Sequence, residues 1–98
     1  MRWGLPYVAN EVMMEYAKKI QIARNPDSPP DLLKKLAEDN YWAVRMAVAG
    51  NPHTPLEILI RLTIDPDSNV QKALQSNPGL PTNTRRRLGT QVRHKRTG

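Results

Sequence analysis

Asn51-Pro52-His53-Thr54-Pro55-Leu56-Glu57-Ile58-Leu59-Ile60-Arg61-Leu62 is the central copy of a repeat that runs through this 98-residue chain. The dipeptide Asn-Pro begins at positions 25, 51 and 77, which gives a 26-residue period, and a further proline follows each copy. The same register aligns Leu33 with Leu59, Leu36 with Leu62 and Leu88, Val44 with Val70, and Ala47 with Ala73. An internal period of this length is typical of proteins built from stacked structural repeats.

Each repeat predicts two short helices. The first follows Ser28-Pro29 or Thr54-Pro55 and covers residues 31–37 or 57–63. We expect the Thr54 hydroxyl to cap its own helix by accepting a hydrogen bond from a first-turn N–H. The second helix covers residues 42–49 or 69–75. Apolar residues three and four positions apart give each helix one buried face; the predicted core is Leu32, Leu33, Leu36, Val44, Ala47, Val48, Ile58, Leu59, Leu62, Val70, Ala73 and Leu74.

The two ends of the repeat array depart from its pattern, as terminal repeats of a solenoid do. A longer N-terminal helix over residues 10–24 is predicted to begin at Asn10, with Val12, Tyr16 and Ile20 along one stripe. In the third unit, Thr84 and Arg85 stand where Ile58 and Leu59 stand in the second. We therefore predict one all-α helical-repeat domain over residues 1–92, with units starting near 25, 51 and 77. A basic tail over residues 93–98 follows it.

The pattern Asn-Pro-x-Thr-Pro-x-Glu-x-Leu-x-x-Leu-x-x-Asp, together with Val-Arg-x-Ala-Val-Ala, resembles the leucine-rich repeat variant family. The matching text is residues 51–62 and Val44-Arg45-Met46-Ala47-Val48-Ala49, and the resemblance covers about residues 22–92. It implies a right-handed solenoid in which α-helices alternate with short 3₁₀-like helices in two layers. HEAT-like repeats are the neighbouring interpretation, but their units are longer, at about 40 residues.

The resemblance implies an interaction module, because the family shares no common catalytic activity. Its best-known member carries a cysteine-held iron–sulfur cluster, and this chain has no cysteine. That cofactor therefore does not carry over. The same absence excludes disulfides, a thiolate zinc site and a cysteine nucleophile.

Other catalytic or metal chemistry finds little support in the sequence. His53 and His94 have no nearby histidine or acidic partner in sequence, whereas a site needs convergent groups. The stretch from Asp65 to Asn69 resembles the start of a calcium loop, but Val70 and Ser76 stand where that loop needs Gly and Glu. A helix-capping turn accounts for this stretch better. We expect no enzyme, no cofactor and no bound metal.

Membrane insertion and export are not predicted either. No apolar run approaches the roughly 20 residues that cross a bilayer. The residues after Met1 lack the apolar core of a secretory leader. We therefore expect a cytoplasmic protein.

The positive charge gathers in the last third of the chain. Residues 1–67 hold eight basic and nine acidic side chains, whereas residues 68–98 hold seven basic and no acidic ones. A run of like charges gains when an anionic partner neutralises it, so these residues are candidates for binding such a partner. They are Arg85, Arg86, Arg87, Arg93, Lys95 and Arg96. The alternative is a solvated tail that serves solubility.

Tyr41 and Trp42 form a second candidate surface. The next repeat has the polar residues Asp67 and Ser68 in their place, so the repeat core does not require aromatic rings there. With Arg45 one helical turn later, the rings are a candidate stacking surface for a base or a partner side chain. The alternative is that Trp42 packs over Tyr16 or Met46 and fills the junction with the N-terminal helix.

Two functions follow from these features. The repeat favours a non-catalytic, protein-binding scaffold, and the basic cap and tail support nucleic-acid binding as the alternative. The sequence does not identify the partner or the oligomeric state.

Overall fold

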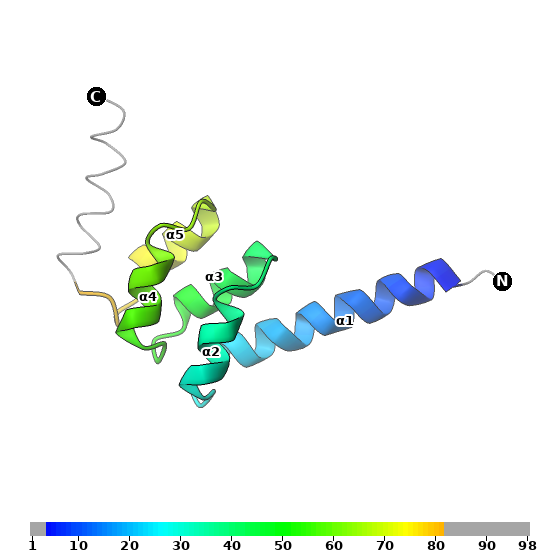
Figure 1. The fold of residues 1–98 in the computed structure, drawn as a ribbon, viewed down its shortest axis with the longest axis horizontal. Coiled ribbons are helices and arrows are strands. Elements are labelled where there is room, and N and C mark those ends of the chain that lie inside the picture. Colours follow the sequence, from blue (N-terminus) through cyan, green and yellow to red (C-terminus); the bar gives the residue numbers. More distant parts are fainter. Residues whose placement is uncertain (1–3, 82–98) are drawn as a thin grey trace, which may run out of the picture.

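The computed structural model describes residues 4–81, and their side chains from Val12 onward. This part of the chain is all-helical, as predicted, and its elements are shown in Figure 1. They are α1 (Gly4–Arg24), α2 (Pro30–Leu36), α3 (Trp42–Gly50), α4 (Leu56–Leu62) and α5 (Ser68–Gln75).

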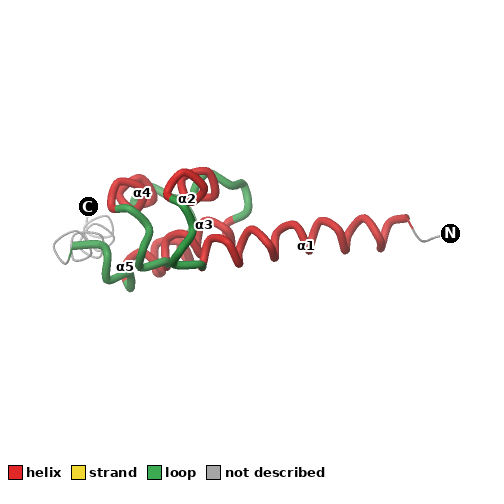
Figure 2. The backbone as a smooth tube through the Cα atoms, turned by 90° about the horizontal axis from the view of Figure 1, so that it is seen from below, coloured by secondary structure: helices red, strands yellow, loops and turns green. Residues whose placement is uncertain are grey.

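The helices form two layers (Figure 2). One layer, called the outer layer below, holds α2 and α4. The other, called the inner layer, holds α3 packed between α1 and α5. Within each layer, equivalent helices begin one repeat apart, at Pro30 and Leu56 for α2 and α4, and at Trp42 and Ser68 for α3 and α5. The architecture is therefore a short stack of two-helix units.

All five helices in the described residues are α-helices, although the resemblance implied that some would be 3₁₀-like. The tighter i→i−3 hydrogen bonds occur at helix ends instead, from Asp39 N–H to the Leu36 carbonyl and from Thr63 N–H to the Ile60 carbonyl, each 3.1 Å long. A seven-residue helix closes its last turn this way because its final carbonyls lack α-helical partners.

The core lies between the two layers. Leu33 and Leu59 point inward from α2 and α4, and Val44 and Val70 meet them from α3 and α5. All four side chains are almost fully buried, as predicted. Leu32 and Ala73, also predicted for the core, are only partly buried at its edge. The other core residues are Ala23, Leu36, Ala47, Val48, Ala49, Ile58, Leu62, Leu74 and Leu80.

Two predicted helix signals are wrong. Helix α1 starts at Gly4, so Asn10 lies inside it and does not cap it. Pro6 falls in the first turn, where a missing N–H costs nothing, and so it does not delay the start of the helix. Thr54 does not cap α4; its buried hydroxyl donates to the Val48 carbonyl at 2.8 Å. It thereby adds a second hydrogen bond to a carbonyl near the end of α3, which also accepts from Asn51 N–H at 3.2 Å.

The asparagines of the Asn-Pro pairs join consecutive repeats. The amide of Asn51 donates to the carbonyls of Ala23 (2.9 Å) and Asn25 (3.0 Å), one repeat earlier. The amide of Asn77 donates in the same way to the carbonyls of Ala49 (2.6 Å) and Asn51 (3.0 Å). Both side chains are buried. Each asparagine thus donates both to a carbonyl in the last turn of the preceding helix and to the carbonyl of the preceding Asn-Pro asparagine, which also accepts from a turn N–H.

Candidate interaction surfaces

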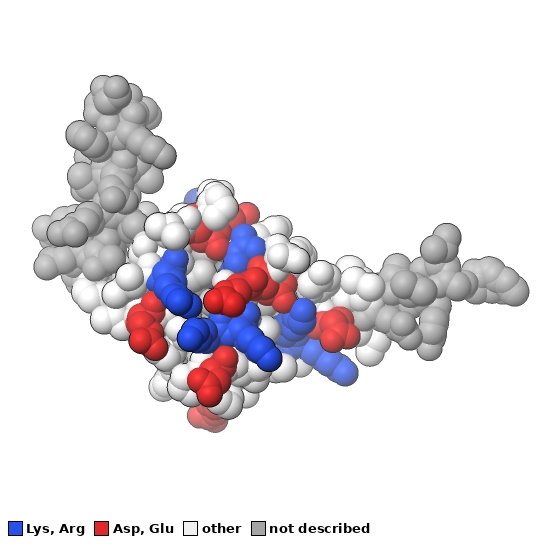
Figure 3. All heavy atoms as spheres, viewed as in Figure 1, with Lys and Arg blue, Asp and Glu red and all other residues white. Residues whose placement is uncertain are grey.

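The six predicted anion-binding residues, Arg85, Arg86, Arg87, Arg93, Lys95 and Arg96, lie outside the described residues. Within the described part, the face formed by α2 and α4 carries both signs of charge interspersed, as Figure 3 shows. One ion pair on it joins α4 to the turn after α2, with Arg61 Nη1 3.5 Å from Glu38 Oε2. This face is therefore a mixed-charge surface and not a cationic patch.

Tyr41 and Trp42, the aromatic residues of the predicted stacking surface, form a cluster with Tyr16. Tyr41, not Trp42, lies over Tyr16, with ring centroids 4.7 Å apart. Trp42 meets the edge of Tyr41 at 5.9 Å. Tyr41 is 37% exposed and Trp42 is 38% exposed. The rings thus close the junction between α1 and α3 and also leave part of their area open to solvent.

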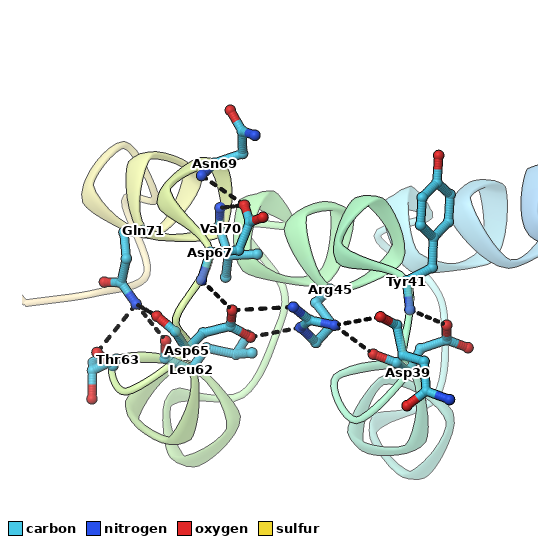
Figure 4. A network of polar contacts seen from close by, with 11 residues as sticks. Asp39, Tyr41, Arg45, Leu62, Thr63, Asp65, Asp67, Asn69, Val70 and Gln71 are labelled. Carbon is cyan, nitrogen blue, oxygen red and sulfur yellow. Dashed lines mark hydrogen bonds and ion pairs between the residues drawn. The ribbon is translucent and has the colours of Figure 1, made fainter.

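Arg45 is held away from these rings by a polar network (Figure 4). Its Nε donates to Asp65 Oδ2 at 2.6 Å, and its Nη1 donates to the carbonyls of Asp39 (2.8 Å) and Asn40 (3.0 Å). The hydrogen bond to Asp65 raises the pKa of the guanidinium, which stays charged. The side chain is only 16% exposed. Arg45 therefore joins the turn after α2 to the turn after α4. A stacking role for Tyr41 and Trp42 stays a prediction.

The same network recurs at the equivalent position of the neighbouring repeats. Lys19, one repeat before Arg45, donates to Asp39 at 2.8 Å. Gln71, one repeat after Arg45, donates to the Asp65 carbonyl at 2.8 Å, as Arg45 does to the carbonyl of Asp39. The sequence analysis did not identify this structural role of the donors at 19, 45 and 71. Their common register was the signal that could have found them.

The turn between α4 and α5 is the predicted helix-capping turn. Asp67 Oδ1 accepts from the N–H groups of Asn69 (2.8 Å) and Val70 (3.2 Å) at the start of α5 (Figure 4). Asp65 Oδ1 accepts from Asp67 N–H at 3.0 Å. Among the described residues, no group of three or more histidine, aspartate or glutamate side chains is placed to hold a metal ion.

Acid should weaken the ion pair between Lys19 of α1 and Asp39 in the turn after α2. Burial raises the pKa of Asp39, but the hydrogen bonds from Lys19 and Tyr41 N–H outweigh burial and hold it below its usual value. A carboxyl whose pKa is lowered by folding stabilises the fold above its unfolded pKa, and that stability is lost as pH falls through the folded pKa. Between about pH 5 and pH 2, urea midpoints of Asp39→Asn should therefore fall less than those of the unaltered chain. Asp31→Asn, at an exposed site on α2, is the control, and an equal flattening there would contradict this origin.

A groove of about 460 Å³ crosses the inner layer, on the side of α3 turned away from Val44 and Val48. It is formed by three helices, and most of its lining is apolar. The residues used below are Ile20 and Arg24 from α1, Ala43, Met46 and Gly50 from α3, and Ala73 from α5. Small side chains on α3 and α5 keep this surface hollow, and Arg24 is the charged residue on its wall. The sequence analysis did not predict this groove.

Gly50 lines the groove, and its backbone conformation does not require glycine. It closes α3 with a backbone outside the left-handed region, and a Cβ placed on it would lie an ordinary 3.9 Å from the Cβ of Ala73. Gly50→Ala should therefore raise the free energy of unfolding by about 0.4–1 kcal/mol, because alanine loses less chain entropy on folding. Urea unfolding tests this, and a less stable variant would show that the site does not tolerate a side chain.

Stacked two-helix units with a continuous core define the class of this protein as a helical-repeat protein. Within that class, the model of the family described as leucine rich repeat variant matches residues 42–67, which hold α3, α4 and the following turn. Residues 42–67 are thus similar to a repeat of that family, as the sequence pattern indicated. The match names a structural repeat and assigns no catalytic chemistry.

The family match covers one unit, so the period of the whole chain stays a prediction. No curated protein and no solved structure matches the chain. No helix in the described residues is long and apolar enough to cross a membrane.

Proposed function

We propose that this protein is a non-catalytic interaction module that binds a segment of another protein in the groove between α1, α3 and α5. The observation that carries the proposal is the apolar hollow of about 460 Å³ on the outside of the inner layer. Concave, largely apolar surfaces with a few polar groups are where proteins bind ligands and peptide segments. The repeat match supports the class of function, since helical repeats commonly present extended binding surfaces.

The groove's lining defines the chemistry of the segment it takes. Met46 offers a flexible apolar side chain and Ile20 a rigid one, which suits an inserted aliphatic side chain. Arg24 is exposed at the wall and favours a carboxylate on the partner. The bound segment is therefore apolar along one side and carries an acidic residue where it passes Arg24.

A groove-filling variant tests this proposal. Gly50→Arg places a long side chain in the hollow, while a Cβ fits there and a cation suits a helix C-terminus. Arg24 already occupies the equivalent position of α1, which shows that the repeat tolerates arginine there. Peptides are first selected from a random displayed library on the unaltered chain. Their affinity for Gly50→Arg should fall about tenfold or more, as for loss of a central contact.

The matched control lies in the other layer. Glu57→Ala removes an exposed side chain of α4 and should leave the affinity of the selected peptides unchanged. Thermal melts of both variants establish that they fold. Equal affinity of the peptides for Gly50→Arg and for the unaltered chain would reject the groove as the binding site.

Nucleic-acid binding is the second candidate, because residues 68–98 hold seven basic and no acidic side chains. If Arg85, Arg86 and Arg87 each contact one phosphate, changing all three to serine should flatten the log–log salt dependence of duplex binding by about three units. Titrations at several salt concentrations measure that slope. An unchanged slope and affinity in a folded triple variant would remove these arginines from the interface.

A further inference from the structure

A second cation lies beside the groove of the inner layer. Ile20 of α1 and Met46 of α3 line this groove, and Lys72 of α5 stands one repeat after Met46. Ala73, the next residue of α5, is part of the groove wall, and Lys72 itself is exposed. Lys72 therefore continues the row of Ile20 and Met46 across the inner layer.

The row holds because the inner helices are joined in the same way at both steps of the stack. The Asn51 amide donates to the carbonyls of Ala23 and Asn25. The Asn77 amide donates to the carbonyls of Ala49 and Asn51, which are the same two positions one repeat later. Helix α5 is thus held against α3 as α3 is held against α1 (Figure 2). Equivalent positions of the three helices consequently lie side by side.

The surface around the groove carries positive charge and no negative charge among the described residues. It comprises positions 17, 20, 21 and 24 of α1 and their counterparts one and two repeats later, and none of these residues is acidic. Arg24 and Lys72 are the basic residues of this set, and both are exposed. Neither forms an ion pair with another described side chain. Such a surface favours a ligand that brings negative charge to both cations.

The spacing of the two cations indicates the length of that ligand. Arg24 belongs to α1 and Lys72 to α5, with α3 between them. Neighbouring helices pack with their axes about 8–10 Å apart, so the two residues are roughly 16–20 Å apart across the stack. An extended peptide advances about 3.3 Å per residue, so about six residues span this distance.

The stretch between the cations favours a peptide over a nucleic acid. It is formed by Ala43, Met46 and Gly50 of α3, which offer apolar area and a hollow. A nucleic-acid strand would bring phosphates to this stretch as well, and α3 has no cation there to neutralise them. An apolar side chain of a peptide gains instead from leaving water at this point.

We propose that the ligand of the groove is an acidic segment of another protein, bound in extended form across α1, α3 and α5. One carboxylate pairs with Arg24, and a second carboxylate about six residues away pairs with Lys72. Between them an apolar side chain enters the hollow beside Met46. This inference rests on the proposed function and adds to it the direction of the bound segment and its second charged contact.

Affinity measurements with peptides test the second contact. The probes are the peptides selected from the random displayed library on the unaltered chain, and variants of them with one acidic residue at a time changed to its amide. The selected peptides should carry two acidic residues about six positions apart, with an apolar residue between them. Lys72→Gln should lower their affinity about two- to fivefold, as for one partly exposed ion pair. It should cause no further loss in the peptide variant whose Lys72-pairing acid is already an amide.

Lys35→Gln is the matched control for Lys72→Gln. It removes the same charge from an exposed site on α2, in the outer layer. The affinity of the selected peptides should stay unchanged, and thermal melts establish that both variants fold. Equal losses at the two lysines would show an effect of net charge alone and would overturn the proposal.

Three other results would also overturn it, and they separate it from the proposed function. If Gly50→Arg weakens peptide binding and Lys72→Gln does not, the groove binds a peptide but the second contact is wrong. If neither substitution changes the affinity, the proposed function fails and this inference fails with it. A single-stranded oligothymidine that displaces the peptides, and that loses affinity in Lys72→Gln, would assign the surface to nucleic acid.

Discussion

Replacing Asn51 with alanine should lower the free energy of unfolding by about 2–5 kcal/mol, a range set by the cost of unpaired buried polar groups. Asn51 is only 2% exposed. Its amide serves the carbonyls of Ala23 and Asn25, and its side-chain oxygen accepts from His53 N–H at 2.9 Å. Alanine removes this donor from the buried Ala23 carbonyl, whereas the Asn25 carbonyl keeps its hydrogen bond from Ser28 N–H. Urea unfolding followed by circular dichroism measures the loss.

Asn25→Ala is the matched control for this prediction. Asn25 occupies the same place in its own Asn-Pro turn, but its side chain is exposed and accepts one hydrogen bond from Asp27 N–H, at 2.9 Å. Asn25→Ala should lower the free energy of unfolding by much less than Asn51→Ala does, on the order of 1 kcal/mol or less for one exposed hydrogen bond. Equal losses at the two positions would show that the turn, and not the joint between repeats, is what the asparagine stabilises.

The inward faces could be predicted because they depend on local periodicity. Leu33 and Leu59, or Val44 and Val70, are aligned by the repeat, and an aligned apolar position in a stacked unit has only the neighbouring unit to pack against. The all-α, stacked architecture follows from the same alignment, whereas the two layers were implied by the resemblance to the repeat family. Helix boundaries were also predictable to within about one residue for α2 to α5, because prolines and capping residues mark them.

The hydrogen bonds that link consecutive repeats could not be predicted, because each residue that makes them also had a sufficient local explanation. Proline alone accounts for the helix end at each Asn-Pro pair, so the role of Asn51 in the preceding repeat went unnoticed. Thr54 stands at a position typical of a helix cap, yet its hydroxyl donates a hydrogen bond to the carbonyl of Val48. Arg45 was assigned to a surface by its spacing from Trp42, whereas its partner Asp65 lies in the turn of the next repeat. Contacts across repeats depend on stacking geometry, which local patterns do not contain.

The groove forms where three helices pack together, so the sequence of a single helix does not predict it. Ala43 and Gly50 are ordinary residues on α3 alone, and Ala73 lies in a different repeat. Only the packing of α1 and α5 against α3 turns these small residues into one hollow. The proposed function therefore rests on tertiary structure, while the repeat itself fixes only the class of protein.

Leu59→Ala should also be strongly destabilising and should lower the free energy of unfolding by about 3–5 kcal/mol. Leu59 is fully buried in α4, at the centre of the core between the two layers. Removing its outer methyl groups leaves a cavity that neighbouring repeats cannot close without shifting the stack, so the lost contact and the cavity both contribute. Leu56→Ala is the matched control, since Leu56 is in the same helix and 44% exposed, and it should lose on the order of 1 kcal/mol or less. Urea unfolding of both variants decides the matter. A smaller loss for Leu59 than for Leu56 would mean that α4 does not pack on the inner layer through the face described above, and that the two-layer stack is wrong.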